Sequence, residues 1–276
     1  MGTTVAKLIE HMDASLYKEY VMERYKEGTN GTPYRGAYKT PKPDFDFTAP
    51  TFKKKVSFEG LKSFAAMQDN HPAKKIFLQR RLPEASWNDI YYCPNFFEFT
   101  NRLVKNKFPS LEGDHPRMVI PFRKQSGEIF AYQGRAFGKE PQKYITIILD
   151  SDYPKIFGMD KVDLSKKTYV VEGPIDSLFL DNCVATAQSD LRIPEYKDNV
   201  VLIPDNEPRN KQITNQIERY IDEGYSVVVW PQGIEQKDIN DMILSGMTHS
   251  EIMMIIHSNT HSGLQAKTVF NNWKRT

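Results

Sequence analysis

The sequence is poor in cysteine, with only Cys93 and Cys183 among 276 residues, and no Cys-x-x-Cys pair exists. Neither a zinc ribbon nor a disulfide framework is therefore predicted. No apolar run approaches the roughly 18 residues of a membrane helix, and no signal peptide is recognisable. We expect a soluble, cytoplasmic protein without membrane contact. The phosphate-binding Gly-x-x-x-x-Gly-Lys-Ser/Thr sequence is also missing, which excludes a built-in ATP-driven motor.

The net charge indicates little about function, because 37 basic and 35 acidic residues leave a value of only +2. Three short apolar runs, 168–171, 200–203 and 227–230, are more informative. Short β-branched runs of this kind are typical of strands buried on both faces, as in a parallel sheet covered by helices. Helices are predicted between and after them, at 174–180, 211–223 and 239–245, and another begins at the capping box of Thr248. The C-terminal half is therefore predicted to be an α/β sheet.

Acidic residues follow each of the three predicted strands. In open α/β sheets ligands bind beyond the carboxyl ends of the strands, so these side chains can converge on one point. Unpaired carboxylates that converge need a cation, and carboxylate oxygen is the ligand that Mg²⁺ prefers. The sequence therefore predicts a magnesium site built from Glu172, Asp176, Asp205, Glu207, Asp238 and Asp241.

Each acidic segment also has an ordinary structural explanation. Pro174 and Asp176 suit the first turn of a helix, where a carboxylate is favoured by the helix dipole. The segment around Asp205 could be a simple turn, and Asp238 could serve only as a helix N-cap. The order of the three segments and their position at strand ends favour the metal site.

Read together, Glu172-Gly-x-x-Asp176, Asp205-x-Glu207 and Lys237-Asp-x-Asn-Asp241 resemble the motifs of a TOPRIM domain. That fold occurs in bacterial and phage primases, in topoisomerases and in some nucleases. The form Glu-Gly-x-x-Asp-x-Leu is similar to that of the primases. The resemblance implies a Rossmann-like parallel sheet flanked by helices, in which Glu172 and Asp176 are catalytic. The family's central motif is usually Asp-x-Asp, so Glu207 is a departure from it.

The segment before the sheet supports the same family. Strands are predicted at 118–122 and 129–132 around a turn at Gly127, with helices at 58–66 and 73–82. Residues 119–144, with their Gly-Arg pair and Pro-x-Lys-Tyr, resemble the basic subdomain of bacterial-type primases, a smaller mixed α+β unit. Residues 75–81 resemble a helix at the start of the polymerase core. The resemblance implies that nucleotide phosphate or template is bound by Arg123, Arg135, Lys143 and Lys237.

Five segments are predicted along the chain. The opening helical pattern resembles the helix that follows the zinc ribbon in this family, and a Pro- and Gly-rich linker comes next. The segments are 1–27 (helical), 28–55 (linker), 56–164 (basic subdomain), 165–262 (TOPRIM domain) and 263–276 (basic tail).

The resemblance implies a DNA primase, a nucleotidyltransferase that synthesises RNA primers from ribonucleoside triphosphates on single-stranded DNA, with Mg²⁺ or Mn²⁺. No structural zinc is predicted, so a separate zinc-ribbon module is an expected partner. A replicative helicase is another, and a phage-encoded protein would act in the host cytoplasm. Two alternatives remain open: a TOPRIM nuclease using the same carboxylates, and a non-catalytic subunit that binds DNA or the helicase.

Overall fold

The computed structural model describes residues 4–26 and 56–275. The chain divides into two units, Met1–Lys53 and Lys54–Thr276. The first contains α1 (Val5–Met12) and α2 (Ala14–Lys26). The single helix expected over 4–26 is interrupted at Asp13, whose backbone is extended and whose Oδ1 accepts the N–H of Ser15 at 2.7 Å. The predicted linker, 28–55, lies outside the described residues.

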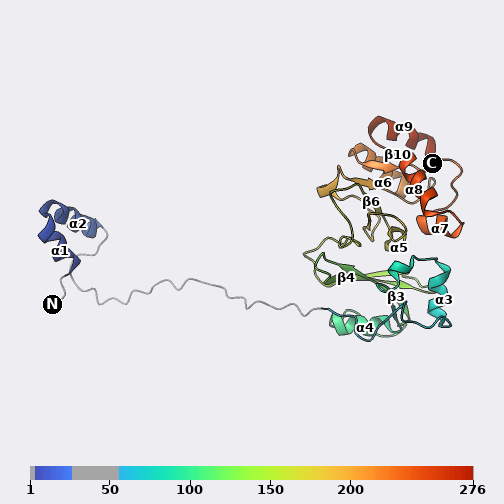
Figure 1. The fold of residues 1–276 in the computed structure, drawn as a ribbon, viewed down its shortest axis with the longest axis horizontal. Coiled ribbons are helices and arrows are strands. Elements are labelled where there is room, and N and C mark those ends of the chain that lie inside the picture. Colours follow the sequence, from blue (N-terminus) through green and yellow to red (C-terminus); the bar gives the residue numbers. More distant parts are fainter. Residues whose placement is uncertain (1–3, 27–55, 276) are drawn as a thin grey trace. The chain divides into compact units, whose positions relative to one another are not determined.

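The second unit begins with an antiparallel sheet whose strand order is β1-β2-β3-β4-β5, and its strands β3 and β4 are drawn in green in Figure 1. The predicted hairpin is confirmed, because β3 and β4 pair in antiparallel register around Gly127, which has a φ of +81°. The elements of this part are β1 (Lys62–Ser63), α3 (Pro72–Gln79), the 3-10 turn Glu84–Ser86, β2 (Tyr91–Cys93), α4 (Phe96–Leu103), β3 (Arg117–Arg123), β4 (Ile129–Ala136) and β5 (Tyr144–Ile148).

The helix predicted at 58–66 is wrong. Gly60 has a φ of +86°, which helical residues do not adopt, and it forms a turn ahead of the two-residue strand β1. Phe58 and Phe64 are nevertheless buried, so their apolar character serves the core without helical periodicity. A short, interrupted apolar pattern does not distinguish these possibilities.

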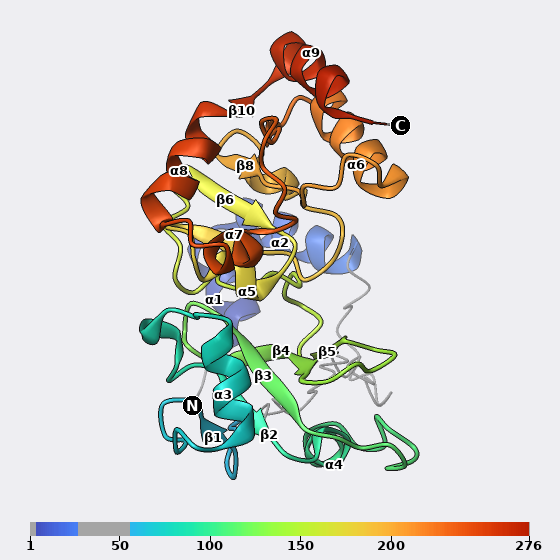
Figure 2. The ribbon, with the colours of Figure 1, turned by 90° about the vertical axis from the view of Figure 1, so that its right-hand side faces the viewer.

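The second sheet has the strand order β10-β9-β8-β6-β7, and its four longer strands are parallel. Figure 2 shows β6 and β8 with helices on either side. The three predicted strands exist as β6, β8 and β9, while the three-residue β7 was not predicted. The elements are β6 (Thr168–Val171), α5 (Pro174–Ser177), β7 (Cys183–Ala185), the 3-10 turn Pro194–Tyr196, β8 (Val200–Leu202), α6 (Lys211–Asp222), β9 (Ser226–Val228), α7 (Ile239–Leu244), α8 (His249–Ser258), β10 (Thr260–His261) and α9 (Gly263–Trp273).

A basic tail was expected over residues 263–276, but most of these residues form the helix α9. Ala266, Phe270 and Trp273 recur at helical spacing and are buried, so this helix packs onto the sheet unit. None of the helices within residues 4–26 and 56–275 is long and apolar enough to span a membrane.

One hydrophobic cluster spans both sheets of the second unit. Phe64, Phe77 and Met118 from the first part belong to the same buried cluster as Tyr169 and Ile175 from the second. A buried polar link joins them as well, since Arg80 Nη1 donates to Asn240 Oδ1 at 2.7 Å. The relative position of the two sheets is therefore fixed by packing.

Gly134 in β4 allows the first sheet to pack against α4. A Cβ at this position would lie 2.3 Å from the ring of the fully buried Phe96. We expect Gly134→Ala to lower the free energy of unfolding by about 1–3 kcal/mol, because the packed ring has to move. Urea unfolding measures this, with Gly138→Ala as control, since a Cβ there meets nothing within 4 Å. Equal losses in the two variants would contradict this packing.

Candidate active site

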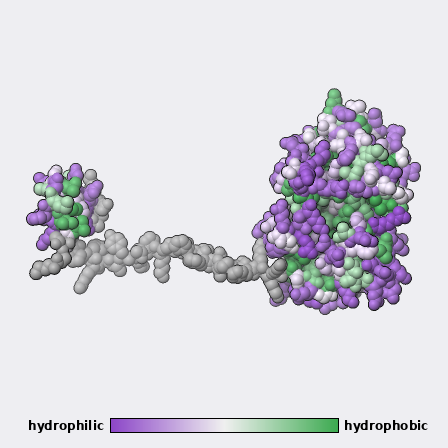
Figure 3. All heavy atoms as spheres, viewed as in Figure 1, coloured by the Kyte–Doolittle hydropathy of each residue, from purple (hydrophilic) through white to green (hydrophobic). Residues whose placement is uncertain are grey.

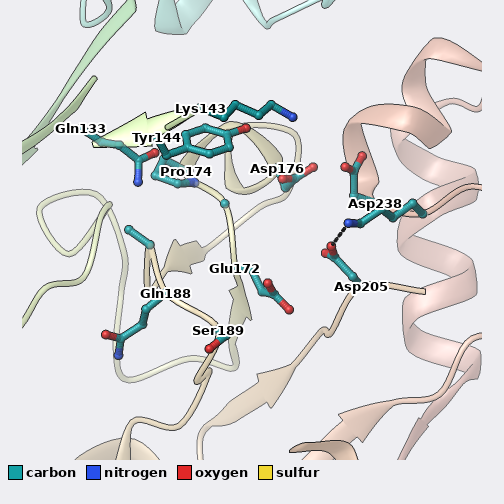
Figure 4. A pocket seen from close by; sticks show the side chains of 13 residues that line it. Gln133, Lys143, Tyr144, Glu172, Pro174, Asp176, Gln188, Ser189, Asp205 and Asp238 are labelled. Atoms are coloured by element: carbon teal, nitrogen blue, oxygen red, sulfur yellow. Dashed lines mark ion pairs between the residues drawn. The ribbon is translucent and has the colours of Figure 1, made fainter. Parts of the chain in front are cut away.

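A polar cavity of about 350 Å³ is lined by residues of both sheets. Figure 4 shows its side chains, in which Glu172 and Asp205 follow β6 and β8, while Asp176 and Asp238 lie at the starts of α5 and α7. Gln133 comes from β4, Tyr144 from β5, and Gln188 and Ser189 from the segment after β7. The lining residues are Gln133, Lys143, Tyr144, Glu172, Gly173, Pro174, Asp176, Ala187, Gln188, Ser189, Asp205, Lys237 and Asp238.

Glu172 directly follows β6 and lines this cavity. Gly173 continues in extended conformation and Pro174 begins α5, so the strand ends with the carboxylate at the sheet edge. Burial, and then the negative charge of Asp205, raise the pKa of Glu172 to about 8. A carboxyl with such a pKa can accept and release a proton near neutral pH.

Asp176 lies in the first turn of α5, as predicted, and its carboxylate is held from another element. The backbone N–H of Asn240 in α7 donates to Asp176 Oδ1 at 2.9 Å. Burial raises the pKa of Asp176, and the negative charge of Asp238 raises it further. The structure thus brings together two acids that stand far apart in the sequence.

Asp205 and Glu207, which follow β8, both form ion pairs with the side chain of Lys237. Lys237 Nζ lies 3.4 Å from an oxygen of Asp205 and 3.2 Å from an oxygen of Glu207. Burial raises the pKa of Asp205 to about 6, although Lys237 acts in the opposite direction. For Lys237, the two ion pairs outweigh partial burial, so its pKa is raised. Asp205 and Lys237 line the cavity, whereas Glu207 lies beside it.

Asp238 is the N-cap of α7, and its Oδ1 accepts the backbone N–H of Asp241 at 2.8 Å. The capping explanation is thus correct for Asp238, yet the side chain also lines the cavity. Burial raises its pKa. The structure does not place Asp241 in the cavity wall, because its side chain is exposed in the first turn of α7.

The lysine and arginine side chains predicted to bind phosphate do not all lie at the cavity. Lys143 is exposed and lines the cavity, as Lys237 does. Arg135 is only 4% exposed, and its Nε donates to the hydroxyl of Tyr144 at 3.3 Å. It therefore positions Tyr144 and does not present a free guanidinium. Arg123 lies at the other end of β3, where its Nη1 donates to the carbonyl of Gly127 at 3.1 Å.

The interpretation of Arg123 as a residue of this site is therefore not supported by the geometry. The antiparallel register pairs Arg123 with Ile129 beside the hairpin turn, while Arg135 pairs with Met118 at the opposite end of the same strands. Because each residue adds about 3.3 Å along a strand, the two arginines are separated by most of the sheet. Arg123 lines a different, smaller cavity with Asp160 and Lys161.

Three polar residues that the sequence analysis did not single out support the site. The Asn206 side chain donates to the carbonyls of Ile234 and Gln236 and accepts from the indole N–H of Trp273, so it joins the loop of Asp205 to that of Lys237. Asn240 holds Asp176, as described. Asn206 and Asn240 lie inside the acidic motifs, next to the carboxylates that were predicted as site residues. Gln133 directly precedes the Gly-Arg pair.

The charge balance of the cavity fits a hard cation. Four carboxylates line it, and the lining lysines are Lys143 and Lys237. In residues 4–26 and 56–275, no three His, Cys, Asp or Glu side chains are arranged to hold a metal ion as they stand. The donors nevertheless fit by chemistry, because carboxylate oxygens suit Mg²⁺. Burial, and the negative charges of neighbouring acids, raise the pKa values of Glu172 and Asp205, and a bound cation would oppose both effects.

These pKa shifts have a testable consequence for stability. Folding raises the pKa of Glu172 from 4.5 to about 8 and that of Asp205 from 3.8 to about 6. The folded state thus binds protons more tightly. This contribution to stability is complete below the unfolded-state pKa values of 3.8 and 4.5, and it is lost as pH rises to about 6 for Asp205 and to about 8 for Glu172. Without divalent ions, urea unfolding should give a lower free energy at pH 8.5 than at pH 6. A value that is constant or rises would contradict the shifts.

Solved structures place this fold among primase catalytic cores. The E. coli primase catalytic core matches with a TM-score of 0.54 at 15% identity, over 74% of this chain and 78% of that one. The RNA polymerase domain of Mycobacterium tuberculosis primase DnaG matches with a TM-score of 0.52 at 17% identity, over 72% and 80%. The second sheet and its helices are therefore a TOPRIM domain, preceded by a mixed α+β subdomain.

Sequence comparison is more specific than fold. The DNA primase of Enterobacteria phage T4 is 32% identical over 264 residues, which covers 94% of this chain and 75% of that protein. The chain belongs to the DNA primase family of this bacterial and phage type, and its enzyme class is that of a DNA-directed RNA polymerase. No family model matches the chain.

Proposed function

We propose that the chain synthesises short RNA primers on a single-stranded DNA template by metal-dependent nucleotidyl transfer, in the cavity between its two sheets. The observation that carries this proposal is the convergence of Glu172, Asp176, Asp205 and Asp238 on one cavity that Lys143 also lines. Such an arrangement suits a substrate with a triphosphate, in which charge has to be neutralised on both the attacking and the leaving oxygens.

Mg²⁺ or Mn²⁺ would be held by Asp205 and Asp238, with Asp176 and Glu207 adjacent. When bound, the metal stabilises charge on the phosphate oxygens. Asp241 contributes through its backbone N–H, which fixes the carboxylate of Asp238. The ammonium of Lys237 is paired with the carboxylates of Asp205 and Glu207, and it would be available to a phosphate oxygen if a cation neutralised those acids.

Glu172 is suited to accept the proton of the primer's 3′-hydroxyl. The 3′-oxygen forms a bond to the α-phosphorus of the incoming nucleotide, and the bond to the leaving pyrophosphate breaks. The raised pKa of Glu172 makes its carboxylate a stronger base than an ordinary glutamate. Lys143, exposed where it lines the same cavity, contributes positive charge for the nucleotide or the template.

The first unit is a candidate surface for protein partners, such as a replicative helicase or a separate zinc-ribbon module. Figure 3 shows apolar side chains on the outside of its two helices. The exposed fractions are 63% for Val5, 54% for Leu8 and 76% for Met12. Apolar side chains that stay exposed within their own unit are typical of interaction surfaces.

The proposed function is tested by incubating the chain with single-stranded DNA, four ribonucleotides of which one is labelled, and Mg²⁺ or Mn²⁺. We expect labelled RNA that requires both the template and the metal. RNA formed only when a short RNA primer is annealed beforehand would assign initiation to a separate module. Metal-dependent cleavage of the DNA without RNA would instead establish a nuclease, and neither product would indicate a binding subunit.

A further inference from the structure

One side chain of the cavity wall has an unsatisfied polar atom. Gln133 in β4 is only 4% exposed, and its Nε2 donates to Thr146 Oγ1 at 3.3 Å. Its Oε1 is buried without a hydrogen-bond partner among the described residues. An unpaired buried acceptor destabilises the folded state, and an apolar side chain of similar size would avoid that loss. Stability alone therefore does not account for an amide at this position.

The location of Gln133 indicates what could supply the missing donor. It lines the same cavity as Glu172 and Asp205, at the end formed by β4 and β5, as Figure 4 shows. Side chains two residues apart on a strand share a face, so Gln133 and Arg135 both face this side of the sheet. Arg135 positions the hydroxyl of Tyr144, which remains 44% exposed beside the cavity.

We propose that this end of the cavity is a nucleoside subsite, in which Gln133 Oε1 accepts a hydrogen bond from an N–H or O–H group of the bound nucleotide. This inference rests on the proposed function. The phosphates would lie toward Lys143 and the carboxylate cluster, so the nucleoside extends toward Gln133 and the exposed ring of Tyr144, on which a base can stack.

The unpaired oxygen makes Gln133 a specificity-determining residue. A nucleotide that provides the donor satisfies the amide, whereas an analogue without it leaves the buried oxygen unpaired. The donor could be a ribose hydroxyl, an exocyclic amino group or a ring N–H of the base. All three have the same hydrogen-bonding chemistry, and nucleotide analogues separate them.

The test is the affinity of the full chain for nucleoside triphosphates in Mg²⁺, measured by calorimetry for wild type and Gln133→Met. The probes are ATP, CTP, GTP, UTP, 2′-deoxy-ATP and 3′-deoxy-ATP. Loss of one hydrogen bond should weaken binding about tenfold for nucleotides that carry the donor. If the affinity for only one deoxy analogue is unaffected by the substitution, the donor is a sugar hydroxyl. If only the affinity for UTP is unaffected, the donor is an exocyclic amino group. If the affinities for ATP and CTP are unaffected, the donor is a ring N–H.

Controls separate this role from a structural one. Gln265→Met, at an exposed position of α9, should bind all six nucleotides like wild type. Gln133→Met should unfold at the same temperature as wild type or higher, because it removes an unpaired acceptor. Unchanged affinities, an equal loss for all six nucleotides, or a lower unfolding temperature would each overturn the proposal.

The subsite and the proposed function can fail separately. If wild type binds nucleotides with the expected dependence on Gln133 but makes no RNA, the subsite stands and the proposed function fails. If RNA is made and Gln133→Met binds every nucleotide like wild type, the proposed function stands and the subsite fails.

Discussion

Glu172→Gln is expected to reduce RNA synthesis by at least about 100-fold, the usual range for loss of a group that transfers a proton in the transition state. The amide has the same shape as the carboxylate but cannot accept the proton of the 3′-hydroxyl. Asp205→Asn should cause a loss of similar size, because the carboxylate of Asp205, which follows β8, is a proposed ligand of the catalytic cation. The measurement is the initial rate of labelled RNA formation on single-stranded DNA at saturating nucleotide.

Glu172→Gln should not lower the free energy of unfolding, although it lowers the activity. Ionisation of Glu172 near pH 8 is opposed by burial and by Asp205, and an amide avoids that cost. Urea unfolding at pH 9 should therefore give Glu172→Gln a free energy equal to or above that of wild type. Glu195→Gln, at an exposed position, is the matched control and should keep its activity. An active Glu172→Gln variant would rule out proton transfer by this residue.

The position of the acidic residues could be predicted from the sequence because the signal is local. Buried parallel strands are continuous apolar runs, and the residue after each run lies at the sheet edge. Glu172 and Asp205 follow β6 and β8 in this way. The helix-capping role of Asp238 was also readable, because N-caps depend on neighbouring residues alone.

The polar contacts between distant segments could not be predicted in this way. Whether the side chain of a lysine or arginine is free or paired depends on residues that only the fold brings together. Lys237 pairs with two acids of another loop, and Arg135 is buried against Tyr144 of the neighbouring strand. The register that separates Arg123 from Arg135 follows from the hairpin, but nothing in the sequence says which end of the hairpin faces the TOPRIM domain.

The basic segment expected over residues 263–276 forms a helix for most of its length. Lys267, Lys274 and Arg275 give residues 263–276 a basic appearance, which favoured a tail. The same segment places apolar residues at positions 266, 270 and 273, a helical stripe that packs on the sheet unit. In a short segment such a stripe is as informative as the charges, which occupy the solvated face of the helix.

Gly173→Ala should reduce RNA synthesis by about 10- to 100-fold with little change in stability. Gly173 has a φ of −98°, which alanine adopts freely. A Cβ there would, however, lie 2.6 Å from Asp176 Oδ2, so that carboxylate must rotate. Rotation would weaken the bond from the N–H of Asn240 to Asp176 Oδ1 and misplace the acid, and misplacement by about 1 Å can cost about 100-fold in rate.

A double-mutant cycle tests whether Gly173 acts through Asp176. The rates of Gly173→Ala, Asp176→Asn and the double variant are compared with wild type, and circular dichroism confirms folding. If the alanine acts only by displacing this carboxylate, it should have little further effect once Asp176 is already asparagine. Fully additive losses would show that Gly173→Ala acts elsewhere in the cavity. Gly138→Ala, where a Cβ has open space, controls for a general effect of replacing glycine by alanine.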